Sequence, residues 1–322
     1  MVTIAAGTNS TTVRYFDVIA RSMNAIARST TLLALRLSFA LGSRLRPAAA
    51  LRRAYRLFCT PQSTSRRRAS AADPGDALVH RMAVGGEQIS VYVWGDPAAQ
   101  PYVLLAHGWS SHGLRFLTWI PPLRDAGYAV VGFDQAAHGR STGERTNLMH
   151  FAEVLCEIGD HYGHASAVVG HSLGGTATLL ALTAGLAADR VVLIAPLADP
   201  FLAASYFGRM IGLAEHLWAH LFDEYEKSYP TRVASLQAHL MAPAIARPAL
   251  IVHDLADREV PWAEGERYAR YWPDARLLTT TDLGHHRIVD DRTVIGAALR
   301  FLQGDRVGER VVSSPNLPYG FA

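Results

Sequence analysis

The feature that most constrains the fold is a serine flanked by glycines, in Gly170-His171-Ser172-Leu173-Gly174. The apolar run 165–169 before it is typical of a buried strand, and the run 176–186 after it is typical of a helix. A sharp strand-to-helix turn strains its central residue, so the positions two before and two after must lack colliding side chains. Both glycines meet this condition. The pattern predicts a tight turn that presents Ser172, whereas the alternative is an ordinary turn in which the serine caps the helix.

The chain from residue 78 onward alternates short β-branched or aromatic runs with longer helical segments, which is typical of an α/β protein. Eight strands are expected, at 80–84, 89–94, 102–106, 128–133, 165–169, 191–195, 249–253 and 276–280. Gly85-Gly86 predicts a hairpin between the first two strands. Helix-length crossovers separate the later strands, so most of the sheet should be parallel, with helices on both faces.

Three regions are expected along the 322 residues. Residues 1–75 form a basic amphipathic helical extension and linker, 76–304 form the main α/β domain, and 305–322 form a tail. Within the main domain, the segment 198–247 is too long for a simple connection between the sixth and seventh strands. Its aromatic residues at mixed helical spacing predict a helical cap over the strand ends.

Charge is distributed unevenly along the chain. Residues 1–70 hold twelve arginines and one acid, Asp17, whereas the remainder holds 19 basic and 27 acidic residues. A basic arm on an acidic body indicates surface attachment, to a membrane or to another part of the protein, rather than a groove for nucleic acid.

Within 13–58, arginines recur every seven or eight residues and leucines every four, up to a break at Pro47. This spacing favours either a membrane-surface helix or a pair of helices docked on the main domain with arginines facing solvent. The segment 61–74 has no periodicity and predicts a linker.

The sequence contains no uninterrupted apolar stretch of about 18 residues, so a membrane-spanning helix is not expected. Cys59 and Cys156 form neither a disulfide framework nor a metal-binding spacing. We therefore expect a cytoplasmic enzyme, with peripheral membrane contact through residues 13–58 left open. A secretory signal or an organelle transit peptide at the basic N-terminus also stays open.

A serine hydroxyl is a poor nucleophile until a base takes its proton and a carboxylate orients the base. Two carboxylates, Asp254 and Asp257, lie just after the strand expected at 249–253. Two histidines, His285 and His286, follow the last expected strand. The order of serine, acid and histidine along the chain is one that such triads adopt. The residues alone do not decide which of the two carboxylates is the acid or which of the two histidines is the base.

These motifs together resemble the α/β-hydrolase superfamily, over about residues 78–303. The resemblance implies a serine hydrolase of the esterase or lipase type, with a helical cap and Ser172 as the nucleophile. The loop 253–261 is similar to the acid loop of this family, which implies Asp257 as the acid and Asp254 as the alternative. Gly284-His285 is similar to the family's Gly-His, which implies His285 as the base and His286 as the alternative.

The segment His107-Gly108-Trp109 resembles the family's His-Gly-x loop. The resemblance implies an oxyanion hole formed by the backbone N–H groups of Trp109 and Leu173. We expect the His107 ring to brace this loop rather than to react. The neighbour of the serine, His171, is expected to pack or form hydrogen bonds.

A further segment, 134–141, resembles the family's Asp-x-Pro-Gly-His-Gly-x-Ser. It departs from that pattern at Ala136 and Ala137, where proline and glycine are usual. We interpret it as a structural loop.

The implied reaction is cleavage of a carboxylic ester or similar acyl bond through an acyl-enzyme, and it needs no metal or organic cofactor. The expected partner is a small, apolar acyl ester. Thioesters, amides and carbon–carbon bonds stay open because the same triad cleaves them, and a non-catalytic ligand-binding protein of the same fold is a further alternative. A haloalkane dehalogenase would need a carboxylate in place of Ser172. The oligomeric state is left open.

Overall fold

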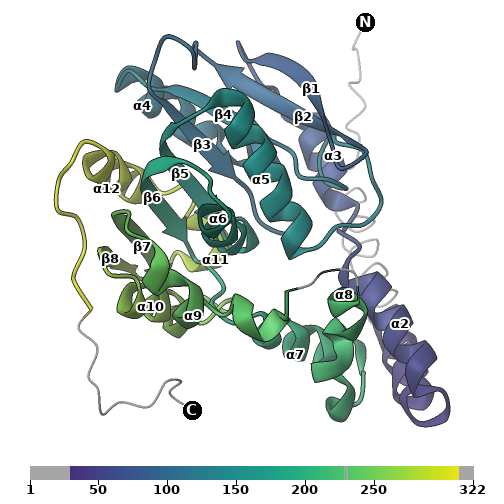
Figure 1. Cartoon of the computed structure of the whole chain (residues 1–322). Coiled ribbons are helices and arrows are strands. Elements are labelled where there is room, and N and C mark those ends of the chain that lie inside the picture. The colour runs from purple at the N-terminus through teal and green to yellow at the C-terminus, as the bar shows by residue number, and fades with distance from the viewer. Residues whose placement is uncertain (1–29, 228, 230, 312–322) are drawn as a thin grey trace, which may run out of the picture. The chain divides into compact units, whose positions relative to one another are not determined.

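The computed structural model describes residues 30–227, 229 and 231–311 (Figure 1). The chain divides into two compact units. One unit contains the described part of Met1–Tyr55 together with Ala204–Tyr225, and the other contains Arg56–Ala203 and the described residues from Glu226 onward. Each unit is described by itself below. The domain boundaries expected from the sequence stay a prediction.

The larger unit is built on one eight-stranded sheet with the order β1-β2-β4-β3-β5-β6-β7-β8. Its strands are β1 Leu78–Val84, β2 Glu87–Trp94, β3 Tyr102–Ala106, β4 Ala129–Phe133, β5 Ala165–His171, β6 Ala188–Ile194, β7 Ala249–Asp254 and β8 Ala275–Thr280. β2 pairs antiparallel with β1 and β4, and every other pair in the sheet is parallel. This confirms the expected α/β fold, with its eight-stranded, mostly parallel sheet and initial hairpin.

Helices cover both faces of this sheet (Figure 1). They are η1 Gly113–Trp119, α4 Ile120–Asp125, α5 Leu148–Tyr162, α6 Leu173–Thr183, α9 Ala238–Met241, α10 Trp262–Tyr271, α11 Gly284–Arg287 and α12 Arg292–Leu302. One core cluster joins η1, α4 and α12 to the sheet, and a second joins α6, α9 and α10. Because both faces are covered, the central strand β3 is buried along its whole length.

The segment expected as a linker is instead partly helical, as α3 Thr64–Ala71. Ser65 and Ala69 are fully buried, and the Arg66 guanidinium donates to the carbonyl oxygens of Ser141 (2.7 Å) and Gly143 (2.6 Å). A search for apolar periodicity does not find this helix because its buried side holds only small side chains. Its attachment to the rest of the larger unit depends on arginine hydrogen bonds instead. The prediction of a linker is therefore wrong over these residues.

The smaller unit contains a helix over residues 30–45 and most of α2 Pro47–Phe58, which meet at Arg46. The expected break at Pro47 is confirmed, whereas residues 13–29 of the predicted amphipathic segment lie outside the described residues. Among the described residues, no helix is long and apolar enough to cross a membrane.

The segment expected as a cap is helical through most of its described length. It contains α7 Pro200–Ile211, η2 Glu215–Leu217, η3 Ala219–Phe222, α8 Asp223–Glu226, η4 Val233–Leu236, α9 and η5 Ala242–Ala244. Residues 204–225 belong to the smaller unit and the rest belong to the larger one. Its placement over the strand ends stays a prediction.

Candidate active site

Ser172 occupies the turn between β5 and α6, with φ 53° and ψ −124°. A positive φ is uncommon for a residue with a β-carbon, and such strain typically costs about 1–3 kcal/mol. The surrounding backbone holds this conformation, because Ser172 N–H donates to Ile194 O (2.9 Å) and Ser172 O accepts from Gly175 N–H (2.9 Å). The sequence-predicted strand, tight turn and helix are confirmed.

The glycines of the turn are required by close backbone contacts. A β-carbon at Gly174 would lie 2.3 Å from the carbonyl oxygen of Ala106, at the end of β3. One at Gly170 would lie 2.7 Å from the Cα atom of Gly175. Gly108 has the same constraint, since its β-carbon would lie 2.9 Å from the Ser172 β-carbon. Three backbone segments thus meet around the serine without room for a methyl group.

His285 connects the serine to a carboxylate. Its Nε2 atom lies 3.0 Å from Ser172 Oγ, and its Nδ1 atom lies 2.7 Å from Asp257 Oδ2. An ionised carboxylate only accepts hydrogen bonds, so Nδ1 carries the ring proton and Nε2 accepts from the serine hydroxyl. The structure therefore brings Ser172, His285 and Asp257 together in one hydrogen-bonded chain, in the arrangement that nucleophilic catalysis requires.

His286 lies in a different environment from its neighbour. Its Nε2 atom is 2.8 Å from Glu259 Oε1, and both side chains are more than half exposed, at 65% and 56%. Hydrogen bonding to Glu259 raises the pKa of His286. The structure pairs this second histidine with Glu259 and the first, His285, with Ser172.

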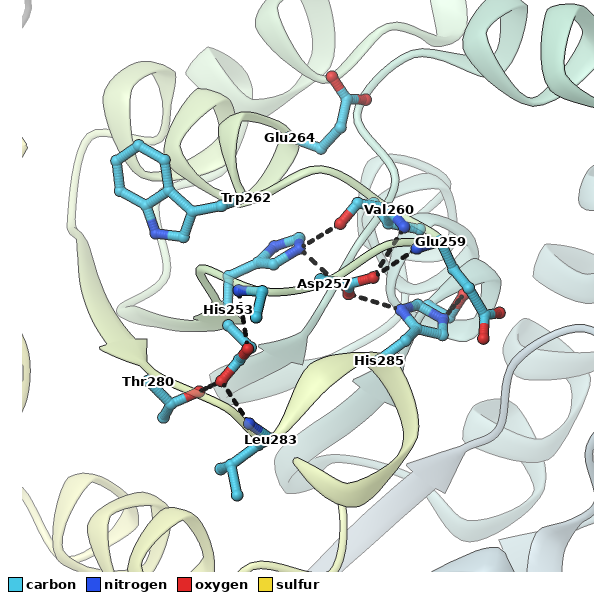
Figure 2. Close-up of polar contacts among 12 residues, drawn as sticks. His253, Asp257, Glu259, Val260, Trp262, Glu264, Thr280, Leu283 and His285 are labelled. Carbon is cyan, nitrogen blue, oxygen red and sulfur yellow. Dashed lines mark hydrogen bonds and ion pairs between the residues drawn. The ribbon is translucent and has the colours of Figure 1, made fainter.

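Asp257 is held by backbone and side-chain donors after β7. Its Oδ1 atom accepts from the N–H groups of Glu259 (2.8 Å) and Val260 (2.9 Å), while Oδ2 faces His285 (Figure 2). The side chain is fully buried. Burial by itself raises the pKa of a carboxyl group, but hydrogen bonds from His253 and His285 outweigh it and hold the pKa of Asp257 well below its ordinary value. Asp257 is therefore ionised at neutral pH.

The other carboxylate, Asp254, organises the loop. It accepts from Thr280 Oγ1 (2.7 Å), from Leu283 N–H (3.0 Å) and from Ala256 N–H (2.9 Å), the first two drawn in Figure 2. Burial opposes ionisation, but these hydrogen bonds hold the pKa of Asp254 below its ordinary value. Asp254 thereby links the end of β7 to the segment that carries His285.

His253 is a residue that the sequence analysis missed. It is fully buried, and its Nε2 atom lies 2.9 Å from Val260 O and 3.5 Å from Asp257 Oδ2 (Figure 2). Gly265 of α10 packs directly on the ring, because a β-carbon there would lie 2.3 Å from Nδ1. The ring thus supports the acid loop from behind. Its place next to Asp254 in the sequence was the available signal.

The residues implied for an oxyanion hole flank the serine turn. Leu173 is the first residue of α6, so its N–H has no acceptor within the helix. Across the residues that the structure describes, Trp109 N–H donates to no protein acceptor either. These free donors fit the implied role, which stays a prediction.

Three buried histidines support the backbone around the site. His107 Nδ1–H donates to Gly108 O (2.7 Å) and Nε2 accepts from Gln135 N–H (2.9 Å), and burial lowers the pKa of His107 to about 4. His138 accepts from Ser110 N–H (2.9 Å), and burial lowers its pKa to about 3.

The third, His171, donates to His285 O (2.9 Å), and burial puts its pKa well below the ordinary value. All three rings are neutral braces.

The loop 134–141 is also structural, as the sequence predicts. Asp134 is fully buried and accepts from Tyr92 Oη (2.6 Å), Gly113 N–H (2.7 Å) and Arg140 N–H (2.7 Å). Ala137 adopts φ 66°, in the left-handed region that favours glycine. This explains why glycine is usual at that position in the pattern the segment resembles.

Comparison with known proteins supports the family that these features indicate. Residues 101–220 match the family model described as the alpha/beta hydrolase fold. The chain is 34% identical over 102 residues to a monoacylglycerol lipase from Mycolicibacterium smegmatis, covering 29% of this chain and 36% of the lipase. It is 29% identical over 164 residues to human monoglyceride lipase, covering 45% of this chain and 52% of the human protein. The chain thus matches about a third to a half of the length of these relatives.

Solved structures extend the similarity to a larger share of the chain. An esterase from Exiguobacterium antarcticum aligns with a TM-score of 0.56 and 15% sequence identity, covering 70% of this chain and 100% of the esterase. At that identity the likeness concerns the fold alone. With this sheet order, the strained serine turn and the match to the family model over residues 101–220, the chain has the α/β-hydrolase fold.

Proposed function

We propose that the chain is a serine hydrolase that cleaves a carboxylic ester through Ser172, His285 and Asp257. The observation that carries the proposal is the 3.0 Å separation between Ser172 Oγ and His285 Nε2, with His285 Nδ1 held 2.7 Å from the Asp257 carboxylate. A base at hydrogen-bond distance from a serine hydroxyl, itself oriented by a buried carboxylate, is the arrangement that activates such a nucleophile.

In the proposed reaction, Ser172 Oγ forms a bond to the ester carbonyl carbon while its proton passes to His285 Nε2. The backbone N–H groups of Trp109 and Leu173 bind the negative oxygen, and one such donor typically lowers the barrier by about 3–4 kcal/mol. The bond to the alcohol then breaks, and the alcohol leaves with the proton from His285. Water attacks the acyl-enzyme through the same histidine and releases the carboxylic acid.

The proposed substrate class is a lipid-derived ester with an apolar acyl chain. Two relatives with partial coverage are named as monoacylglycerol or monoglyceride lipases, which supports this class without fixing the acyl length. A panel of monoacylglycerols, p-nitrophenyl esters, thioesters and amides of matched chain length measures the preference. Faster turnover of thioesters or amides than of esters would contradict the proposed bond type.

The central test is Ser172→Ala. We expect kcat for a short p-nitrophenyl ester to fall by at least about 10⁴-fold, because the nucleophile is lost while the fold remains. Ser166→Ala on β5, a partly exposed serine of the same strand, is the matched control and should keep full activity.

Labelling with a fluorophosphonate probe, read by mass spectrometry, should modify Ser172 in the unaltered protein. Absence of an adduct together with absence of hydrolysis would assign the fold a binding role instead, whereas full activity of Ser172→Ala would exclude Ser172 as the nucleophile.

A further inference from the structure

The helix over residues 30–45 carries a row of exposed leucines, which we call the leucine stripe. Its members are Leu33, Leu37, Leu41 and Leu45, and their exposed fractions are 58%, 62%, 60% and 69%. Residues four apart lie on one side of a helix, so the four side chains form one continuous apolar surface. Isolated exposed leucines are ordinary on protein surfaces, but a contiguous row of them indicates an interaction site.

The opposite side of the same helix makes the internal contacts of the smaller unit. Phe39 is 1% exposed and lies beneath the Arg53 guanidinium, 4.7 Å from the ring centroid. Ser43 is 4% exposed and its Oγ accepts from Ala214 N–H (3.2 Å). The packing of the unit thus uses another face of the helix. The interpretation in which these helices dock on the main domain with arginines facing solvent stays a prediction.

A shallow apolar hollow of about 530 Å³ adjoins the stripe. It is lined by Leu32, Leu33, Arg36, Leu37, Ala40 and Gly212. The stripe and this hollow together offer space for acyl chains or apolar side chains beside a helix.

The segment of the chain that carries the stripe has charges of one sign. The sequence has no acidic residue between Asp17 and Asp73. Five arginines of the smaller unit, Arg36, Arg44, Arg46, Arg52 and Arg53, are exposed. Arginine side chains can extend beside an apolar surface and keep their charged ends at a polar boundary. An apolar row on a helix whose own charged side chains are all cationic is typical of a helix that lies in the interface of an anionic membrane.

We propose that the leucine stripe and its neighbouring arginines bind the surface of an anionic phospholipid bilayer, with the helix in the plane of the interface. Charge complementarity favours this occupant. A second copy of the chain would bring like-charged arginines together, and residues 1–29 add three arginines against one acid. The proposal concerns attachment alone and does not depend on the chemistry of Ser172.

The first test is flotation of the full chain with vesicles of phosphatidylcholine, alone or mixed with phosphatidylglycerol. We expect flotation with the mixed vesicles. The variant Leu37→Gln/Leu41→Gln should partition at least about tenfold less, because it removes half of the stripe and keeps good helix formers. Leu78→Gln on β1, which replaces a leucine that is 68% exposed, is the matched control and should float like the unaltered protein.

A second pair of variants tests the charge contribution. Arg44→Gln/Arg52→Gln should weaken partitioning into phosphatidylglycerol vesicles on the order of tenfold and reduce its sensitivity to salt. Arg81→Gln/Arg300→Gln, which changes two exposed arginines of the larger unit, should have little effect.

Three results would overturn the proposal. The first is that the full chain does not float with anionic vesicles, and the second is that Leu37→Gln/Leu41→Gln floats as well as the Leu78→Gln control. The third is that the unaltered protein is an oligomer and that Leu37→Gln/Leu41→Gln makes it a monomer. The last would assign the stripe to a second copy. Hydrolysis of a short p-nitrophenyl ester, measured without vesicles, reports whether each variant is folded, and circular dichroism does so if the ester is not a substrate.

Discussion

The turn that carries Ser172 and the loop that carries Asp257 position their side chains by different means. In the turn, glycine backbones meet at distances that leave no space for a β-carbon, and this close packing adds to the backbone hydrogen bonds that hold the serine. In the loop, the aspartate is held by hydrogen bonds from two backbone N–H groups and two imidazoles. From this difference we expect that the turn is sensitive to changes in side-chain volume. The loop should be sensitive to changes in side-chain charge and hydrogen bonding.

The largest expected effect is that of Asp257→Asn, which changes polarity at constant volume. The amide oxygen can still accept from Glu259 and Val260 N–H, but the amide nitrogen would donate to His285 Nδ1 and move the ring proton to Nε2. We expect kcat to fall about 10⁴-fold because Ser172 loses its acceptor. Steady-state kinetics measures the loss, and thermal unfolding checks that the fold persists. Activity near that of the unaltered protein would remove Asp257 from the proposed triad.

The converse change adds volume in the turn. Gly174→Ala should lower the free energy of unfolding by about 3 kcal/mol, since its β-carbon would meet backbone oxygen at 2.3 Å and the turn must shift. Gly296→Ala in α12 is the matched control. Nothing lies within 4 Å of its added β-carbon, so it should raise stability by up to about 1 kcal/mol. Urea unfolding compares the two, and equal effects would contradict packing as the basis of the turn.

Asp254→Asn sharpens the comparison within the loop. We expect a loss of about 1–2 kcal/mol in the free energy of unfolding at neutral pH, because Thr280 and Leu283 lose an ionised acceptor. The folded pKa of Asp254 is depressed, so its contribution is complete above the unfolded value of about 3.9 and is lost as the pH falls through the folded value. Unfolding at several pH values should show the difference shrinking below about pH 4. A 10⁴-fold loss of kcat without a loss of stability would instead make Asp254 the acid.

The smallest effect is expected for His286→Gln, at the exposed end of the site. The pair with Glu259 is more than half exposed, so its loss should change stability by less than about 1 kcal/mol. The folded pKa of His286 is raised, so this contribution is present below the unfolded pKa of about 6.5 and disappears as the pH rises through the folded value. Parallel assays of His286→Gln and His285→Gln should leave only the first active. The reverse outcome would exchange the two histidines in the proposed mechanism.

The sheet could be predicted closely from the sequence. Parallel strands covered on both faces appear as continuous apolar runs, and all eight expected segments overlap the observed strands. The serine turn could be predicted because a tight turn has no space for β-carbons at Gly170 and Gly174, which is a local requirement that the sequence shows directly. Spacing did not decide between Asp254 and Asp257 as the acid, or between His285 and His286 as the base. Residues so close together in a loop can each face the serine, and the sequence does not show which one does.

The features that sequence reasoning did not find depend on contacts between distant segments. His253 supports Asp257 only because α10 presents Gly265 to its ring. The helix α3 is attached through arginine contacts with carbonyl oxygens some 75 residues away along the chain. In the helix over residues 30–45, leucine spacing predicted helicity correctly but did not reveal that Phe39 and Ser43, rather than the leucines, are buried.

The neutral histidine braces link unfolding to proton uptake. An imidazole in an unfolded chain binds a proton below about pH 6.5, whereas in the folded protein His107 resists protonation to about pH 4 and His138 to about pH 3. His171 resists it as well. Each brace therefore costs about 1.4 kcal/mol of stability per pH unit of acidification between its unfolded and folded pKa. Between about pH 6.5 and pH 4, acidification is therefore expected to destabilise the fold through rings that brace the site.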